Sequence, residues 1–246
     1  MNRGFYTVSS GMLVQQRNLN VIGNNIVNSQ TPGYRGERVV TSTFEQELVT
    51  RLEKGKYTRI GTADQIATVD TVETIFDESS LYESSNPYDL AVCGDGYFNV
   101  SDGENTFLTR NGCFNIDSEG FLVMDEIGRV QGTNGDIYIG GSDFKVMTDG
   151  TVYDQNGVFA GQLVLTKPAE DAEILKLQNG YFLTDNVVAA ENVVVRQGVY
   201  ERSNVDMNDE YTRLIEAQAA FKACSTALSM IDAMNQKSAS SIASIT

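Results

Sequence analysis

The N-terminal segment carries the apolar spacing of an amphipathic helix. Heptad positions a and d, alternately three and four residues apart, fall at Phe5, Val8, Met12, Gln15, Leu19, Ile22 and Ile26. The positions between them are polar and mostly uncharged. Pro32 disfavours helical backbone at Thr31, and Gly33 permits a left-handed turn. The pattern therefore predicts a helix over residues 4–29, after which the chain leaves at Pro32, Gly33 and Tyr34.

The C-terminal segment repeats this spacing. Its row of heptad positions, called here the seam, runs through Met207, Glu210, Leu214, Ala217, Phe221, Cys224, Leu228 and Ile231 and then becomes poor in apolar residues. Asp206, Asp209 and Glu210 place negative charge in the first turn, where the helix dipole favours it. Neither terminal helix has much apolar surface outside its seam. We therefore expect the two helices to pair, with further copies of the chain covering the remainder.

The middle of the chain follows a different pattern. Residues 86–200 alternate turn dipeptides, such as Asn111-Gly112 and Asn156-Gly157, with short β-branched and aromatic runs, which is typical of a sandwich or irregular barrel. Residues 35–85 are rich in Thr, Ser, Asp and Glu, which favours an extended arm with one or two short strands. A short helix over residues 44–54 is an alternative.

These patterns together predict an α+β fold. Long N- and C-terminal helices are expected to pair as a coiled-coil-like stalk, with a central all-β domain. The predicted segments are an N-terminal helix in 1–34, an extended arm in 35–85, a β-rich domain in 86–200 and a C-terminal helix in 201–246.

The charge of the chain excludes some classes of partner. It carries 18 basic and 33 acidic residues, for a net charge of −15. Nucleic acids and anionic membrane surfaces need a basic face, so neither is an expected partner. The sequence has no run of about 18 apolar residues, and its N-terminus lacks the unbroken apolar stretch of a secretory signal peptide. We expect no direct membrane insertion, and any export must use a route without a cleaved signal.

Few residues suited to catalysis or metal binding are present. The chain has no histidine, which removes the commonest general base and transition-metal ligand. The segment 149–157 resembles a Ca²⁺ loop only slightly, because it lacks the bidentate glutamate of an EF-hand. Most carboxylates lie in turn motifs, where turn formation is their usual role. We therefore expect no catalytic, cofactor or metal site, and a protein that is not an enzyme.

The three cysteines have different settings. Cys224 lies on the seam of the C-terminal helix, so a buried thiol is expected. Cys93 and Cys113 lie in strand-like segments, and a disulfide between them is possible. An odd number of dispersed cysteines does not make a disulfide framework.

Motifs in a fixed order along the chain resemble the flagellar rod and hook protein family. They are Gly11-Met12-Leu13-Val14-Gln15-Gln16, the run from Leu19 to Asn28, Thr31-Pro32-Gly33-Tyr34, Pro87-Tyr88-Asp89-Leu90-Ala91-Val92, Gly94-Asp95-Gly96-Tyr97-Phe98-Asn99-Val100, Thr109-Arg110-Asn111-Gly112, Glu201-Arg202-Ser203-Asn204-Val205-Asp206, and the helix through Ile215 to Phe221. Ile26-Val27 is bulkier than the family's usual small residue, and Gly36 replaces a common basic residue. The resemblance implies a structural subunit of the bacterial flagellar basal-body rod, which self-assembles into the axial drive shaft that transmits torque.

The resemblance also implies partners and a location. The partners would be other flagellar rod and hook proteins, further copies of this chain and the flagellar type III export apparatus, at the basal body outside the cytoplasmic membrane. The short segment 46–85 favours a proximal, FlgF-type member over a distal, FlgG-type one, although the N-terminal block and Ser203-Asn204-Val205 are as typical of the FlgG type. We expect the subunit interface to comprise Phe5, Val8, Met12, Leu19, Ile22, Asn24, Asn25, Ile26, Leu214, Phe221, Leu228 and Ile231.

Two other classes of protein stay open on the residues alone. One is a secreted glycan-binding β-module that dimerises through a helical hairpin. Its aromatic residues would stack on sugars, although hydrophobic core is their more common role. The other is a hydrolase with two catalytic carboxylates, for which acidic residues are plentiful.

Overall fold

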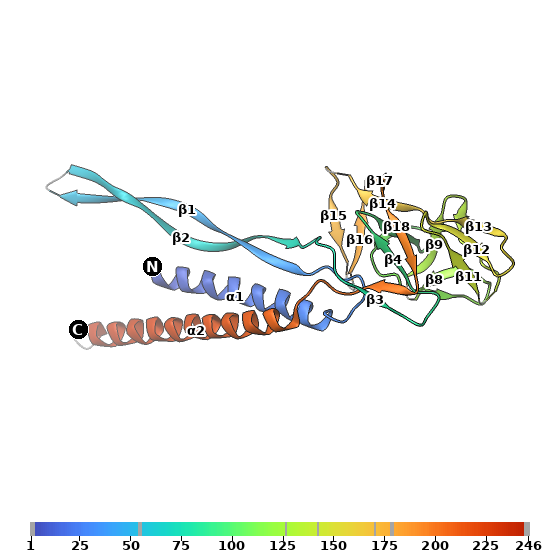
Figure 1. Cartoon of the computed structure of the whole chain (residues 1–246). Coiled ribbons are helices and arrows are strands. Elements are labelled where there is room, and N and C mark those ends of the chain that lie inside the picture. Colours follow the sequence, from blue (N-terminus) through green and yellow to red (C-terminus); the bar gives the residue numbers. More distant parts are fainter. Residues whose placement is uncertain are drawn as a thin grey trace. The chain divides into compact units, whose positions relative to one another are not determined.

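The computed structural model describes residues 3–53, 56–125, 127–141, 143–169, 171–177 and 180–243 (Figure 1). The chain forms two compact units. The helix–hairpin unit comprises Met1–Val27, Gly36–Ile75 and Asp206–Thr246, and the β unit comprises Asn28–Arg35 and Phe76–Val205. The chain therefore passes from one unit to the other after Val27, Arg35, Ile75 and Val205.

Both helices of the described residues belong to the helix–hairpin unit; they are α1 (Arg3–Val27) and α2 (Met207–Ala243). The start of α2 is capped, because the Asp206 carboxylate accepts a hydrogen bond from the Asn208 N–H at 2.8 Å. α1 ends at Val27, short of the predicted residue 29. In the described part of the chain, neither helix is long and apolar enough to cross a membrane.

The helix–hairpin unit also contains a long antiparallel hairpin of β1 (Glu37–Glu53) and β2 (Lys56–Thr74). Its register shifts between Val40 and Thr41 and again between Val49 and Thr50. The prediction of short strands was therefore wrong in length, and the alternative helix over 44–54 was wrong for residues 44–53; residue 54 lies outside the described residues. Thr and Val recur in both strands, and such β-branched residues favour extended backbone when a paired strand supplies the hydrogen bonds.

The predicted coiled-coil-like stalk is wrong, although the chain is α+β with a central all-β unit. α1 packs against α2 and also against both strands of the hairpin, so it is an inner element of a layered unit. Its most buried apolar side chains are Val21 and Ile22, each 4% exposed, and Val14, 7% exposed. Val14 and Val21 lie off the predicted seam. Their burial is explained by the hairpin, which provides α1 with a second apolar surface. Residues 232–240 of α2 are exposed, so the pairing covers only part of that helix.

The described part of the β unit contains a ten-stranded sheet and three smaller sheets, all with antiparallel pairing. The large sheet joins in order β15 (Ile174–Lys176), β16 (Tyr181–Thr184), β6 (Thr106–Thr109), β5 (Tyr97–Ser101), β9 (Gly128–Gly132), β8 (Leu122–Met124) and β7 (Asn115–Ile116), with β10 (Gly135–Asp136) on β9, and β14 (Leu165–Pro168) on both β5 and β17 (Val187–Ala189). The smaller sheets are β11 (Phe144–Val146) with β12 (Thr151–Asp154) and β13 (Phe159–Gln162), β18 (Val194–Gln197) with β4 (Leu90–Cys93), and β19 (Val199–Glu201) with β3 (Leu81–Glu83).

An apolar core lies between these sheets. Phe98 and Phe114 are buried and meet edge to face, with ring centroids 5.1 Å apart. Leu90, Val100 and Leu122 from three different strands are fully buried around them. A smaller cluster of Tyr97, Leu108 and Phe182 lies near the residues that carry the chain between the units. The more common role of aromatic residues, hydrophobic core, therefore holds for Tyr97, Phe98, Phe114 and Phe182, which are buried.

The backbone at Gly112 leaves no room for a side chain. A Cβ atom there would lie 1.6 Å from the Leu90 carbonyl oxygen. We expect Gly112→Ala to lower the free energy of unfolding by about 3 kcal/mol, because the backbone of β4 would have to move. Gly141→Ala is the matched control, since its Cβ would meet only the Gln155 side chain at 3.4 Å. Urea unfolding followed by circular dichroism measures both variants, and equal midpoints would contradict the expectation.

All three cysteines are free and half-buried. The possible disulfide between Cys93 and Cys113 is therefore not formed. Cys224 faces α1, where a Cβ at Gly11 would lie 3.7 Å from its sulfur. Burial, aided by the neighbouring Asp89 carboxylate, raises the pKa of the Cys113 thiol to about 12.

This raised pKa makes the folded protein resist alkylation at Cys113. At pH 8 the reactive thiolate is scarcer in the folded than in the unfolded chain, so we expect iodoacetamide to label Cys113 at least ~100-fold more slowly in buffer than in urea. Peptide mass spectrometry of timed samples measures the two rates. Similar rates in both solvents would show that the thiol is not held in a buried, acid-flanked setting.

Candidate assembly surface and the buried ionic cluster

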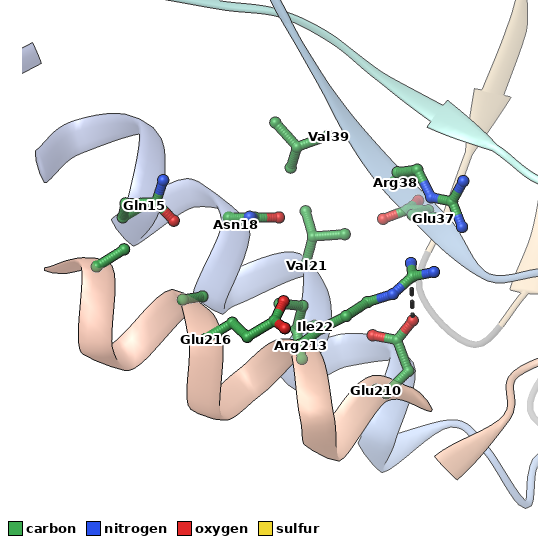
Figure 2. A pocket seen from close by; sticks show the side chains of 12 residues that line it. Gln15, Asn18, Val21, Ile22, Glu37, Arg38, Val39, Glu210, Arg213 and Glu216 are labelled. Atoms are coloured by element: carbon green, nitrogen blue, oxygen red, sulfur yellow. Dashed lines mark ion pairs between the residues drawn. The ribbon is translucent and has the colours of Figure 1, made fainter. Parts of the chain in front are cut away.

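A groove runs between the two helices and the beginning of the hairpin within the helix–hairpin unit (Figure 2). Its volume is about 470 Å³. α1, β1 and α2 each contribute to its lining, which consists of Gln15, Asn18, Val21, Ile22, Glu37, Arg38, Val39, Glu210, Arg213, Glu216, Ala217 and Ala220. The lining of the groove is therefore mixed, with small and branched apolar side chains beside a majority of polar and charged ones.

An acidic residue lies buried beside this groove. Glu210 is 7% exposed, and its Oε1 atom lies 3.7 Å from the Arg213 Nη1 atom (Figure 2). The Arg213 guanidinium makes a closer ion pair with Asp209, at 2.7 Å. The other oxygen, Glu210 Oε2, is buried and has no hydrogen-bond partner among the described residues. An unpaired buried carboxylate oxygen is costly, so it indicates where a donor from outside the chain would be favoured.

Asn25 joins α1 to the first residue of the hairpin. Its side-chain nitrogen donates to the Glu37 carbonyl at 2.8 Å, and its side-chain oxygen accepts from the Glu37 N–H at 2.9 Å. The Asn25 amide thus makes the two hydrogen bonds that a neighbouring strand would make with Glu37 at the edge of the hairpin. Asn25 is 2% exposed, so its polar groups are used within the chain.

The structure places the seam residues of both helices inside the same unit. Ile22 is buried, and the other apolar positions are half-buried, namely Phe5, Val8, Met12, Leu19, Ile26, Leu214, Phe221, Leu228 and Ile231. Asn24 is exposed. The sequence analysis missed a second row, Val14, Asn18, Val21 and Asn25, which recurs four, seven and eleven residues after Val14. This helical spacing is present in the sequence. Two of the four residues, Asn18 and Asn25, are polar, so the row did not look like a buried face.

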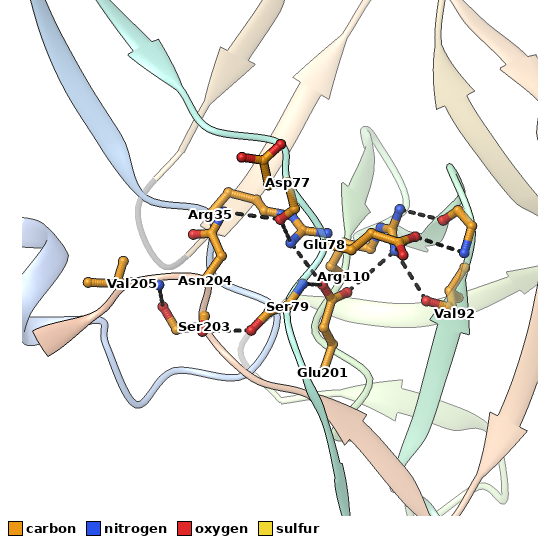
Figure 3. Close-up of polar contacts among 11 residues, drawn as sticks. Arg35, Asp77, Glu78, Ser79, Val92, Arg110, Glu201, Ser203, Asn204 and Val205 are labelled. Atoms are coloured by element: carbon orange, nitrogen blue, oxygen red, sulfur yellow. Dashed lines mark hydrogen bonds and ion pairs between the residues drawn. The ribbon is translucent and has the colours of Figure 1, made fainter.

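A buried ionic cluster lies in the β unit near the points where the chain enters and leaves it (Figure 3). Glu201 is 1% exposed and lies between two arginines: its Oε1 atom is 2.8 Å from Arg35 Nη1, and its Oε2 atom is 3.4 Å from Arg110 Nη1. Arg35 is fully buried and Arg110 is 3% exposed. Such a triad is stable only when further hydrogen bonds satisfy it.

Backbone groups supply several of those hydrogen bonds, whereas Arg35 Nε, Arg35 Nη2 and Arg110 Nε are buried without a hydrogen-bond partner among the described residues. Glu201 Oε1 accepts from the Ser79 N–H at 2.9 Å, and Arg110 donates to the carbonyl oxygens of Val92 and Gly94 at 3.2 and 2.6 Å (Figure 3). Arg35 also donates to the Asp77 carbonyl. The cluster therefore links residues close to three of the points where the chain passes between the units. Arg35 lies directly before one of these points, Asp77 lies shortly after the second, and Glu201 lies shortly before the third.

The predicted helix exit packs against this cluster. The Gly33 N–H donates to the Glu201 carbonyl at 2.8 Å, and Gly33 has φ of 67°, as its turn requires. Tyr34 is 3% exposed, and the Lys176 ammonium lies 4.1 Å from the centre of its ring. Lys176 also donates to the Arg35 carbonyl at 2.7 Å. Pro32 is half-buried in the same turn.

Tyr97 closes the cluster on its apolar side. The Arg110 guanidinium lies 4.8 Å from the centre of its ring. Burial raises the pKa of the Tyr97 hydroxyl and outweighs the opposing effect of Arg110 and Arg35. The hydroxyl therefore stays neutral beside the arginines, which is the state of a structural rather than a reactive group.

The acidic residues of the segment with a Ca²⁺-loop resemblance stabilise turns. The Asp149 carboxylate accepts from the Thr151 N–H at 3.0 Å, and the Asp154 carboxylate accepts from the Val158 N–H at 2.8 Å. These backbone donors hold the pKa values of both carboxyl groups below the ordinary value. Within the described ranges, no group of three or more acidic or cysteine side chains is placed to hold a metal ion.

Comparison with known proteins gives three family matches in chain order. Residues 5–35 match the model described as "Flagella basal body rod protein". Residues 91–154 match "Flagellar hook protein FlgE/F/G D1 domain", and residues 196–242 match "Flagellar basal body rod FlgEFG protein C-terminal". The matched regions include α1, much of the β unit and nearly all of α2.

Whole-length relatives agree with these matches. The chain is 30% identical to the flagellar basal-body rod protein FlgG of Bacillus subtilis, over 96% of this chain and 98% of that protein. It is 26% identical to the flagellar hook-basal body complex protein FlhO of the same species, over the whole of both chains. It is 27% identical to the flagellar basal-body rod protein FlgF of Caulobacter vibrioides, over 90% of each.

These similarities define a structural protein of the flagellum. The chain belongs to the flagellar basal-body rod and hook protein family. Its relatives are rod and hook proteins rather than enzymes, which confirms the prediction of a non-enzymatic role. The glycan-binding module and the two-carboxylate hydrolase therefore lose their support.

The ionic cluster yields a stability test. Glu201→Gln would leave two buried arginines with no carboxylate between them, so we expect the free energy of unfolding to fall by about 3 kcal/mol. Glu119→Gln is the matched control, because Glu119 pairs with Arg129 while its side chain is 65% exposed; we expect a loss below about 1 kcal/mol. Urea unfolding measures both, and equal losses would mean that the buried triad does not stabilise the β unit.

Proposed function

We propose that the chain is a structural subunit of the bacterial flagellar basal-body rod, which assembles with further copies of itself and with other rod and hook proteins into the axial drive shaft. The observation that carries this proposal is the ordered family match at α1, the β unit and α2. The proposed role is mechanical: torque passes through many repeated contacts between neighbours. Such contacts are heterologous, which means that two different surfaces of the subunit meet. They do not close into a dimer, so they can extend along an axis.

The surface of the helix–hairpin unit supports this role. Apart from the buried Ile22 and Ala217, the apolar seam residues remain half-buried within the chain. Large apolar side chains also lie exposed outside the seam, among them Leu13 at 62%, Ile215 at 68% and Met234 at 68%. Exposed apolar surface of this extent is typical of an interaction site. We propose that neighbouring subunits complete the burial of both helices, through the seam residues already named.

The finer proposal is a proximal, FlgF-type position in the rod. It rests on the short segment 46–85 and on the FlgF relative that covers 90% of this chain. The FlgG relative, which this chain covers along 98% of its length, supports the distal alternative. Export through the flagellar type III apparatus and a place outside the cytoplasmic membrane are parts of the same proposal.

A deletion of this gene in its own bacterium tests the proposal. We expect loss of swimming, and electron microscopy of isolated motors should show a membrane ring with a missing or truncated rod. Re-expression of the chain is the control and should restore both. A complete rod and hook in the deletion strain would overturn the role, whereas a stump that retains the proximal rod would overturn only the FlgF-type position.

A further inference from the structure

The outer face of α1 carries one cation close to two exposed apolar side chains. Arg17 is the only charged residue in positions 4–27, and its side chain is exposed. Leu13 lies one helical turn before it and is 62% exposed, and Tyr6, a further two turns back, is 51% exposed. None of the three belongs to the lining of the groove. α1 therefore presents a cationic, apolar patch on a different face from the groove.

The charged residues of the groove are mainly acidic. Its lining holds Glu37, Glu210 and Glu216 against Arg38 and Arg213, and Asp209 pairs with Arg213 at 2.7 Å. The buried Glu210 Oε2 atom has no partner among the described residues. Ala217 and Ala220 are small, and they leave room between α2 and the hairpin for part of another side chain. A long donor side chain that enters with an apolar neighbour fits this chemistry.

We propose that the groove binds the Leu13–Arg17 patch of α1 from a second copy of this chain. Arg17 of the second copy donates to the Glu210 carboxylate, which has an unpaired oxygen and lies in the lining of the groove, while Leu13 packs over Ala217 and Ala220. Charge complementarity selects the occupant: α1 has no acidic residue, and the first part of α2 is acidic. The proposal rests on the proposed function, because it names one contact of axial self-assembly.

The geometry of this contact makes it open-ended. Patch and groove lie on different faces of one unit, so a copy whose groove is filled still offers its own patch to the next copy. Such a heterologous contact extends along a line. It also explains why a carboxylate stays buried and incompletely paired in the single chain, since its partner arrives only on assembly.

Charge variants of the full-length protein test the energetic part. Sedimentation velocity over a concentration series measures self-association. We expect Arg17→Glu and Glu210→Gln to weaken it at least ~10-fold, as for loss of one partner of a desolvated ion pair, and Arg17→Lys to weaken it less. Lys145→Glu is the matched control for Arg17→Glu, because it makes the same charge change at an exposed residue of the β unit, and it should leave association unchanged.

Crosslinking tests the location. A photo-reactive benzoylphenylalanine is placed at position 17 of the full chain, and this protein is mixed with ¹⁵N-labelled wild type so that mass spectrometry separates contacts between chains from those within one. We expect crosslinks between chains at residues 37–39 or 210–220. If Glu210→Gln fails to fold by circular dichroism, the Arg17 variants and this map decide.

The outcomes separate this contact from the wider role. Crosslinks between chains that map elsewhere, no such crosslinks at all, or equal association of Arg17→Glu and wild type would overturn the proposed contact. If the deletion strain nevertheless lacks its rod, the proposed function stands without it. A complete rod in the deletion strain would instead remove the function, whatever contact the purified protein makes.

Discussion

The ion pairs between Glu201 and the two arginines Arg35 and Arg110 are the interaction on which the arrangement of the β unit depends. All three side chains are buried, and each belongs to a segment far from the others in sequence. Burying these charges is unfavourable until each meets its partners, so an alternative arrangement that separates them is strongly disfavoured. In this chain the triad holds together segments of the β unit that precede the hairpin, follow it and precede α2. The triad therefore contributes mainly by disfavouring other arrangements of the chain, rather than by the net attraction between its charges.

That constraint has a consequence for the helix–hairpin unit. Its elements come from three stretches of chain, and each stretch connects to residues held next to the triad. The residues that connect α1, the hairpin and α2 are therefore held together within the β unit. Inside the helix–hairpin unit, Asn25 repeats this device on a small scale, because its amide secures the first residue of β1 to α1. Polar contacts thus set the connections, and apolar contacts such as Val21 and Ile22 fill the space.

The sequence was informative wherever a local pattern decides the structure. Both helices, the strand-rich middle and the exit at Gly33 follow from periodicity and turn chemistry. The length and pairing of the hairpin were missed, because the strand that pairs with residues 44–53 lies in another segment of the sequence. The prediction of a coiled-coil-like stalk was wrong for the same reason. Val14 and Val21 form a second packed face of α1, which can be recognised only once the hairpin is known. Arg35 and Glu201 read as ordinary charged residues until pairing across the chain buries them.

The incomplete burial of the helices then acquires a physical meaning. A pair of helices in water is marginal unless its apolar faces are covered, and here α1 is covered on two sides while α2 is covered on one. The exposed Ile215 and Met234 and the unpaired oxygen of Glu210 show that parts of α2 are incompletely covered or paired in the single chain. Under the proposed self-assembly, the arrival of a neighbour lowers the free energy of this surface. It would satisfy groups of the helix–hairpin unit that the single chain leaves open, as the buried triad satisfies charged groups within the β unit.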